Sequence, residues 1–163
     1  MAHIKEIDLT YTSIRELPFS FPNLSELHHF TIWDCGMLRF PKDNDKMYSI
    51  VFSNMTKLTL HRCNLSDECL PIFLKWFVNV KLLDLSWNNF KLIPECISEC
   101  HLLNDLRLNY CKSLEEIRGI SPNLERLSAK ECISLSSSSR RMLLSQVCCF
   151  ILQYIVLHIQ SIM

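Results

Sequence analysis

The chain has 163 residues, enough for one ordinary domain or a short repeat array. Its 48% hydrophobic and 21% charged residues exclude both a disordered chain and a membrane bundle. The 17 basic and 17 acidic side chains balance, so the composition provides no general attraction to nucleic acid or to anionic lipid.

Cysteine and glycine occur in unusual numbers. The nine cysteines are an odd count, and no apolar signal segment follows the N-terminus, whereas a secreted disulfide framework usually has an even count behind such a signal. We therefore expect reduced cysteines and a cytoplasmic, or alternatively nuclear, protein. The two glycines exclude a glycine-rich phosphate-binding loop, and we expect no cofactor.

A repeat organises most of the chain. Each copy reads apolar-x-x-apolar-x-apolar and leads to a position that holds Asn, Cys or Thr. In chain order the copies start at Ile4, Leu27, Met55, Val80, Leu103 and Leu124. The position that closes the motif, here called the ladder position, holds Thr12, Cys35, Cys63, Asn88, Cys111 and Cys132. The spacing falls within the range of roughly 20–29 residues that is typical of leucine-rich repeats.

The period-two core of each copy predicts a short strand with one buried face. Pairs such as Leu17-Pro18, Phe40-Pro41, Leu70-Pro71 and Ile93-Pro94 follow the strands, and proline cannot donate to a sheet, so they should mark the irregular convex return. We expect an α/β repeat fold, a curved leucine-rich-repeat solenoid with parallel strands on its concave face. Residues 1–135 would form about six repeats, and residues 136–163 a Ser-rich exit and an apolar tail.

Side chains between the buried positions should point to the concave face, in three columns across the strands. The columns begin with Glu6 and His29, with Asp8 and Thr31, and with Thr10 and Trp33. Aromatic rings and arginines, which dominate protein interfaces, recur there and beside the ladder positions. The candidate protein-binding residues are Tyr11, His29, Trp33, His61, Arg62, Trp87, Arg107, Tyr110, Arg126 and Lys130. Ordinary solvated strand residues are the alternative interpretation.

The later repeats are more specific than the general motif. The run from Leu83 to Phe90 followed by Ile93-Pro94-Glu95-Cys96-Ile97, the run from Cys111 to Leu124, and the segment from Ala129 to Ser139 carry a family resemblance. Together they resemble the C-terminal repeats of plant TIR-type nucleotide-binding leucine-rich-repeat resistance proteins, particularly those of legumes. The resemblance covers about residues 1–146, and Ser121 stands where proline is expected.

The resemblance implies a non-enzymatic role in pathogen sensing. In that family the repeats recognise pathogen effectors and help to hold the receptor inactive, while the nucleotide switch and the TIR domain lie N-terminal to them. The partner would then be an effector, a guarded host protein or the receptor's own missing domains, and the chain would be a fragment. A stand-alone repeat adaptor remains the alternative.

Other sites are less well supported. Cys96, Cys100 and His101 could suggest a zinc site, but their spacing is loose and no second ligand pair stands nearby, so no metal is expected. Asp84 and Asp105 could approach each other across adjacent coils, yet nothing in the sequence indicates the burial that a catalytic acid pair needs. No catalytic residue is expected.

The tail from Met142 onward is strongly apolar and has no Asp, Glu, Lys or Arg. Gln153, His158 and Gln160 interrupt a run that would otherwise approach the ~20 residues of a membrane span. We favour a helix that covers the last coil, or sequence unrelated to the fold, over a membrane anchor.

Overall fold

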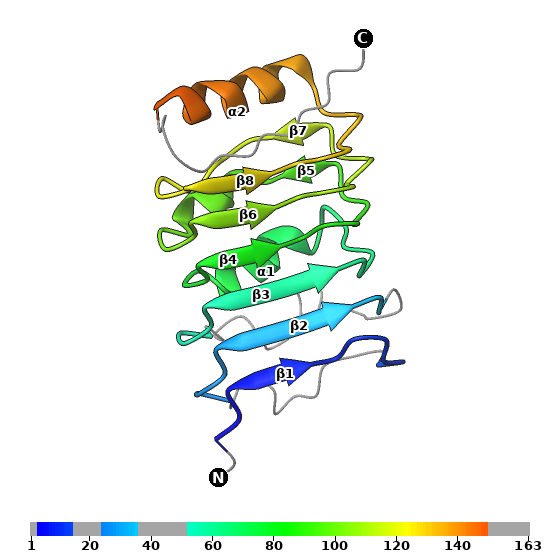
Figure 1. Ribbon diagram of the computed structural model, residues 1–163, viewed down its shortest axis with the longest axis vertical. Coiled ribbons are helices and arrows are strands. Elements are labelled where there is room, and N and C mark those ends of the chain that lie inside the picture. Colours follow the sequence, from blue (N-terminus) through cyan, green and yellow to red (C-terminus); the bar gives the residue numbers. More distant parts are fainter. Residues whose placement is uncertain (1–2, 15–23, 36–51, 150–163) are drawn as a thin grey trace.

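Six parallel strands form one sheet in the computed structural model, which describes residues 3–14, 24–35 and 52–149. The strands are β1 (Glu6–Asp8), β2 (His29–Trp33), β3 (Lys57–His61), β4 (Leu82–Asp84), β6 (Asp105–Arg107) and β8 (Arg126–Ser128). They lie in the order β1-β2-β3-β4-β6-β8, so each strand pairs with that of the next repeat, as in a solenoid (Figure 1). The predicted leucine-rich-repeat fold is confirmed.

The strand register aligns the repeats as their motif predicted. Glu6 lies opposite His29, His29 opposite Lys57, and the same column continues through Leu82, Asp105 and Arg126. A shift by one residue would turn every apolar side chain to the wrong face, so the pattern of buried residues specifies this register. The first two predicted columns are therefore parallel rows of side chains on the sheet, and the third is paired at Trp33 and His61.

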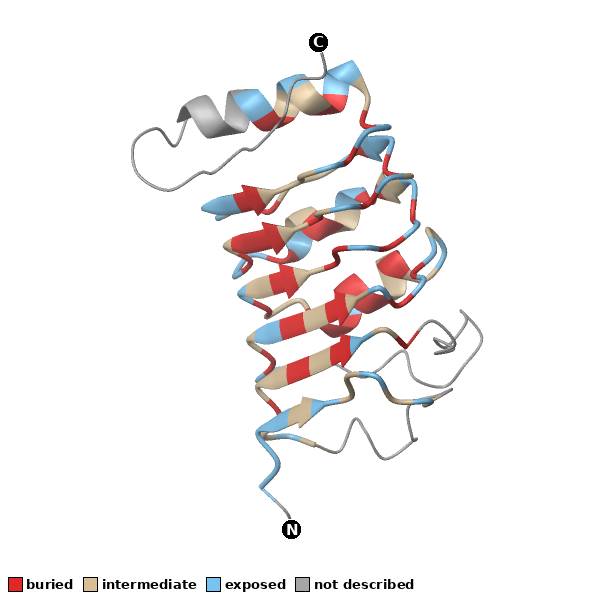
Figure 2. Cartoon of the chain, turned by 45° about the vertical axis from the view of Figure 1, so that its right-hand side comes forward, coloured by how far each residue is buried: buried red, intermediate tan, exposed pale blue. Residues whose placement is uncertain are grey.

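The core lies between this sheet and the return segments (Figure 2). Phe30, Leu58, Leu83 and Leu106, which occupy equivalent places in successive strands, are each 2% exposed or less. The stacked apolar positions of neighbouring coils thus form one continuous core, which is how repeat proteins bury what a single repeat cannot.

The ladder residues tie each coil to the one before it. Asn88 is fully buried; its Oδ1 accepts from the N–H groups of Cys63 and Leu65, each at 3.0 Å, and its Nδ2 donates to the carbonyl oxygen of Leu60 at 2.7 Å. The cysteine thiols make a single-donor version of this contact. The Cys111 thiol, for example, donates to the Leu85 carbonyl oxygen at 3.3 Å.

The return side holds the helices α1 (Leu70–Trp76) and η2 (Glu95–Glu99) and a two-stranded parallel sheet of β5 (Leu92–Ile93) and β7 (Glu116–Ile117). Leu70-Pro71 opens α1, since proline fits the first turn of a helix.

The expectation that such pairs mark irregular structure is wrong at Ile93, which ends β5. Its carbonyl oxygen accepts from the Arg118 N–H at 2.9 Å, and only the following Pro94 lacks a donor. The pairs at 17–18 and 40–41 lie outside the described residues.

The helix α2 (Ser137–Cys149) follows the last repeat and lies against it (Figure 1). Leu143 is 1% exposed, and the buried Ser139 hydroxyl accepts from the Ile117 N–H at 3.0 Å.

Among the described residues no helix is long and apolar enough to cross a membrane. Most of the apolar tail, residues 150–163, lies outside the described part, and the division of the chain at residue 135 stays a prediction.

Candidate functional site

The residue before each ladder position has a left-handed backbone. Tyr11, Asp34, Arg62, Trp87, Tyr110 and Glu131 have φ between 54° and 62°. This conformation costs a non-glycine residue roughly 1–2 kcal/mol. In five of the six repeats the N–H of this residue pairs with the next coil, which helps to hold the conformation; the Trp87 N–H, for example, donates to the Asn109 carbonyl oxygen at 2.8 Å. The turn carries these side chains to the edge of the sheet.

Five aromatic side chains form a continuous row along this edge, here called the aromatic row. Its members, in order, are Tyr11, Trp33, His61, Trp87 and Tyr110. Successive ring centroids lie 6.2, 4.6, 6.2 and 4.3 Å apart. The tightest pair is Trp87 and Tyr110, which stack at 21°.

The aromatic row stays accessible although its rings cover one another. Trp33 is 42% exposed, Trp87 44% and Tyr110 37%. Rings already packed in fixed positions lose little side-chain entropy when a partner covers them, and tryptophan and tyrosine are the residues most often found at the centre of protein interfaces.

His61 at the middle of the row has an unusual environment. Its Nδ1 is buried and has no hydrogen-bond partner among the described residues. Burial lowers the pKa of the imidazole; Asp84 and Asp34 oppose this shift and Arg62 adds to it. The neutral ring is therefore favoured, which suits its packing between Trp33 and Trp87.

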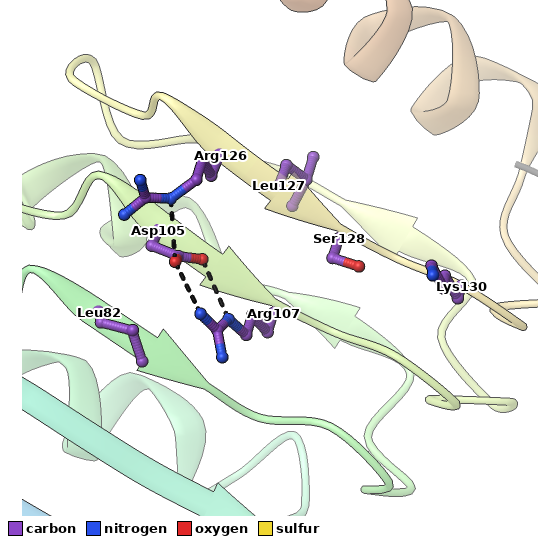
Figure 3. Close-up of a pocket in the computed structure, with 7 residues that line it drawn as sticks. All are labelled: Leu82, Asp105, Arg107, Arg126, Leu127, Ser128 and Lys130. Carbon is purple, nitrogen blue, oxygen red and sulfur yellow. Dashed lines mark hydrogen bonds and ion pairs between the residues drawn. The ribbon is translucent and has the colours of Figure 1, made fainter. Parts of the chain in front are cut away.

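A basic cleft of about 470 Å³ opens on the same sheet near its C-terminal end (Figure 3). Its lining residues are Leu82, Asp105, Arg107, Arg126, Leu127, Ser128 and Lys130. They come from β4, β6 and β8 and the segment after β8, so the cleft runs across three neighbouring strands of the sheet.

Asp105 holds the two arginines of this cleft in place. Its side chain is only 5% exposed, and Oδ2 lies 3.0 Å from Nη2 of Arg107 and 3.1 Å from Nε of Arg126. Nε of Arg107 donates to Oδ1 at 3.3 Å, which makes that pair bidentate. A buried carboxylate is expected only where cations and hydrogen bonds compensate for lost hydration, and both are present here.

Sequence reasoning missed the burial of Asp105. A signal was available, because the predicted columns already put Asp105 beside Arg126 and two residues before Arg107. Asp105 lies opposite Leu82, while Asp84 lies opposite Arg107, so the two acids considered as a pair are not partners in the register. Asp105 forms ion pairs with two arginines and does not share a proton with a second carboxyl group.

The structure brings eight of the ten candidate residues into the aromatic row or the basic cleft. The two others, His29 and Arg62, take part in exposed pairs: His29 Nδ1 lies 4.0 Å from Glu6 Oε2, and Arg62 Nε lies 3.4 Å from Asp34 Oδ1. Exposed pairs of this kind contribute little to stability. The structure places these residues, and their role in binding stays a prediction.

Three of the four ladder cysteines are poor candidates for thiol chemistry. Burial raises the pKa of the Cys63 and Cys111 thiols to about 12 and that of Cys132 to about 11. A thiol that stays protonated is a poor nucleophile. Cys100, in the sequence pattern considered for zinc, is also buried with its pKa raised to about 12, and the described residues contain no group of His, Cys, Asp or Glu side chains that could hold a metal.

The parallel solenoid, its ladder of Asn and Cys, and an accessible aromatic row define a leucine-rich-repeat protein. Comparison with known families makes this more specific: residues 4–155 match the leucine-rich repeats of RPS4B-like disease resistance proteins. The match covers most of the chain, and the chain belongs to this family.

Individual relatives agree with this assignment. The chain is 32% identical over 88 residues to a probable disease resistance protein of Arabidopsis thaliana, covering 54% of the chain and 5% of the relative. It is 31% identical over 133 residues to the disease resistance-like protein DSC1 of the same plant, covering 77% and 10%. It is 32% identical over 88 residues to the TMV resistance protein N of Nicotiana glutinosa, covering 54% and 7%. The chain thus spans a tenth or less of the length of these relatives.

Proposed function

We propose that the chain is the protein-binding repeat module of a plant intracellular immune receptor. It binds a pathogen effector or a guarded host protein, or it contacts the nucleotide-binding and TIR domains of its own receptor and so helps to keep that receptor inactive. The module acts in the cytoplasm or nucleus, performs no catalysis and is a fragment of a longer receptor.

The aromatic row is the observation that carries this proposal. A monomeric protein gains little stability from large aromatic side chains that stay 37–44% exposed, yet the same side chains contribute strongly to binding when a partner removes them from water.

The test measures binding of the full chain to three groups of proteins: secreted effectors of plant pathogens, host proteins including the targets of those effectors, and isolated nucleotide-binding and TIR domains of related receptors. Biolayer interferometry gives the affinity of each pair. The key variant replaces Trp87 and Tyr110 with asparagine, because asparagine tolerates the left-handed backbone of both positions better than alanine does. We expect the variant to lose at least about tenfold in affinity for any partner that the original chain binds.

Asp34→Asn is the matched control, since Asp34 has the same backbone conformation at φ 58° but no ring. It should bind as the original chain does, and circular dichroism should show equal folding for both proteins. Unchanged affinity of the Trp87 and Tyr110 variant would contradict the proposed surface. Binding confined to host proteins other than receptor domains or effector targets would favour a stand-alone adaptor.

A further inference from the structure

The aromatic row and the basic cleft adjoin at one point of the sheet. The Tyr110 N–H donates to the carbonyl oxygen of Lys130 at 2.7 Å, and Lys130 lines the cleft. Trp87 stacks on Tyr110 from the other side. An extended segment that lies across β4, β6 and β8 can therefore contact rings and cations at the same time.

The cleft has unused hydrogen-bond donors. Asp105 engages Nε and Nη2 of Arg107 and Nε of Arg126. Among the described residues, Nη1 of Arg107 and both terminal nitrogens of Arg126 make no hydrogen bond, and the Lys130 ammonium makes neither a hydrogen bond nor an ion pair. Figure 3 shows the terminal nitrogens of the two arginines beyond the Asp105 carboxylate, and Lys130 at the other end of the cleft.

The charge of the cleft favours an anion, but only locally. Its lining carries three cationic side chains and one carboxylate, and Asp84, opposite Arg107 in the sheet, offsets part of the excess. Farther along the sheet the same rows hold Glu6 and Asp8. A long polyanion such as nucleic acid would meet these carboxylates, whereas one or two acidic side chains would not.

We propose that the basic cleft binds an acidic side chain of an extended segment in the partner protein, and that an apolar side chain of the same segment packs on Trp87 and Tyr110. Asp105 orients the arginines before binding, so a carboxylate can accept from their free N–H groups without further ordering. This inference rests on the proposed function and specifies the chemistry of the partner.

The experiment begins with selection of random phage-displayed peptides on the full chain. We expect the enriched peptides to carry Asp or Glu close to Leu, Phe, Tyr or Trp. One enriched peptide is then synthesised, together with a form in which glutamine or asparagine replaces its acidic residues, and isothermal titration calorimetry gives both affinities.

Two variants test the cations. Lys130→Gln removes a side chain with no ion pair, so folding should not change, and Arg126→Gln leaves Arg107 on Asp105. Each should weaken peptide binding about tenfold, and the acid-free peptide should lose no further affinity on the variants. Arg118→Gln is the matched control, because it removes the same charge from an exposed residue that pairs with Glu116 away from the cleft.

The remaining outcomes are distinguishable. Enriched peptides without acidic residues, or equal weakening by Arg118→Gln, would overturn the carboxylate site; the proposed function would survive if replacing Trp87 and Tyr110 still abolished binding. Competition by inorganic phosphate at the peptide's own concentration would reveal a general anion site and would also overturn it. Absence of any enriched peptide would overturn the carboxylate site, while the proposed function would still stand or fall on binding to effectors and receptor domains.

Discussion

At Asn88 a single amide connects two coils, while most other ladder positions hold a thiol. The amide both accepts and donates, so it satisfies N–H groups of the preceding coil as well as carbonyl oxygens of both coils. A thiol is a weak donor and poor acceptor, and Cys111 satisfies only carbonyl oxygens. The two residue types fit the same place in the fold and contribute differently to its stability.

Replacing Asn88 with alanine should therefore lower the free energy of unfolding much more than replacing Cys111. We expect a loss of about 4 kcal/mol for Asn88→Ala, because several buried backbone groups lose their partners, and about 1 kcal/mol for Cys111→Ala. Urea denaturation followed by circular dichroism measures both. Equal losses would show that the amide bonds add nothing beyond the packing of the ladder.

At the scale of elements, α2 differs from the repeats it follows. The short helices of the return side belong to individual coils, whereas α2 lies over the last coil and buries Leu143 there. A repeat at the end of a stack leaves apolar surface uncovered, and a helix with one apolar side can shield it. The Ser139 hydroxyl adds a specific contact, because it accepts from the N–H of Ile117 in β7.

Two adjacent leucines of α2 give a matched test of this role. Leu143→Ala should lower the free energy of unfolding by about 3 kcal/mol, since it leaves a cavity beneath the helix. Leu144 is 47% exposed, and Leu144→Ala should change the stability by no more than about 0.5 kcal/mol. Urea denaturation of the two variants checks this. If both leucines were equally dispensable, α2 would not stabilise the end of the solenoid.

For the molecule as a whole, burial is uneven along the solenoid. Ile7 in β1 is only partly buried, whereas Leu58 and Leu83, which occupy the equivalent positions of β3 and β4, are nearly inaccessible. Within the described part of the sheet β1 pairs with β2 alone, while every strand between β1 and β8 has two neighbours. In a repeat protein stability depends on such nearest-neighbour contacts, so the first coil should open before the central ones.

Hydrogen exchange should reveal this gradient. The Leu9 amide bonds to β2, and the Leu85 amide makes the equivalent bond to β6, where its carbonyl partner is Arg107. We expect the Leu9 amide to exchange at least about tenfold faster, because local opening there costs less free energy. Nuclear magnetic resonance can follow both amides. Equal protection at the two sites would indicate a solenoid that opens only as one unit.

How much of this could be predicted from the sequence depends on the kind of feature. The repeat spacing, the strands and their register follow from the apolar positions, because only one register buries Phe30, Leu58 and Leu83 together. The identity of the ladder residues and the rows of side chains beside them follow from the same pattern. The sequence by itself therefore determined the scaffold and which residues lie on each face of its sheet.

Only the tertiary structure decided which of these residues act together. The left-handed backbone at Trp87 and Tyr110 brings their rings into contact and joins them to Trp33 and His61, although no periodic pattern predicts side-chain direction in a turn. Asp105 is buried, and it pairs with arginines from its own strand and the next. The aligned repeats show which residues are neighbours, but they do not show how deeply a side chain is buried. Periodicity records which face a residue occupies, whereas burial and contact depend on the size and direction of its neighbours in three dimensions.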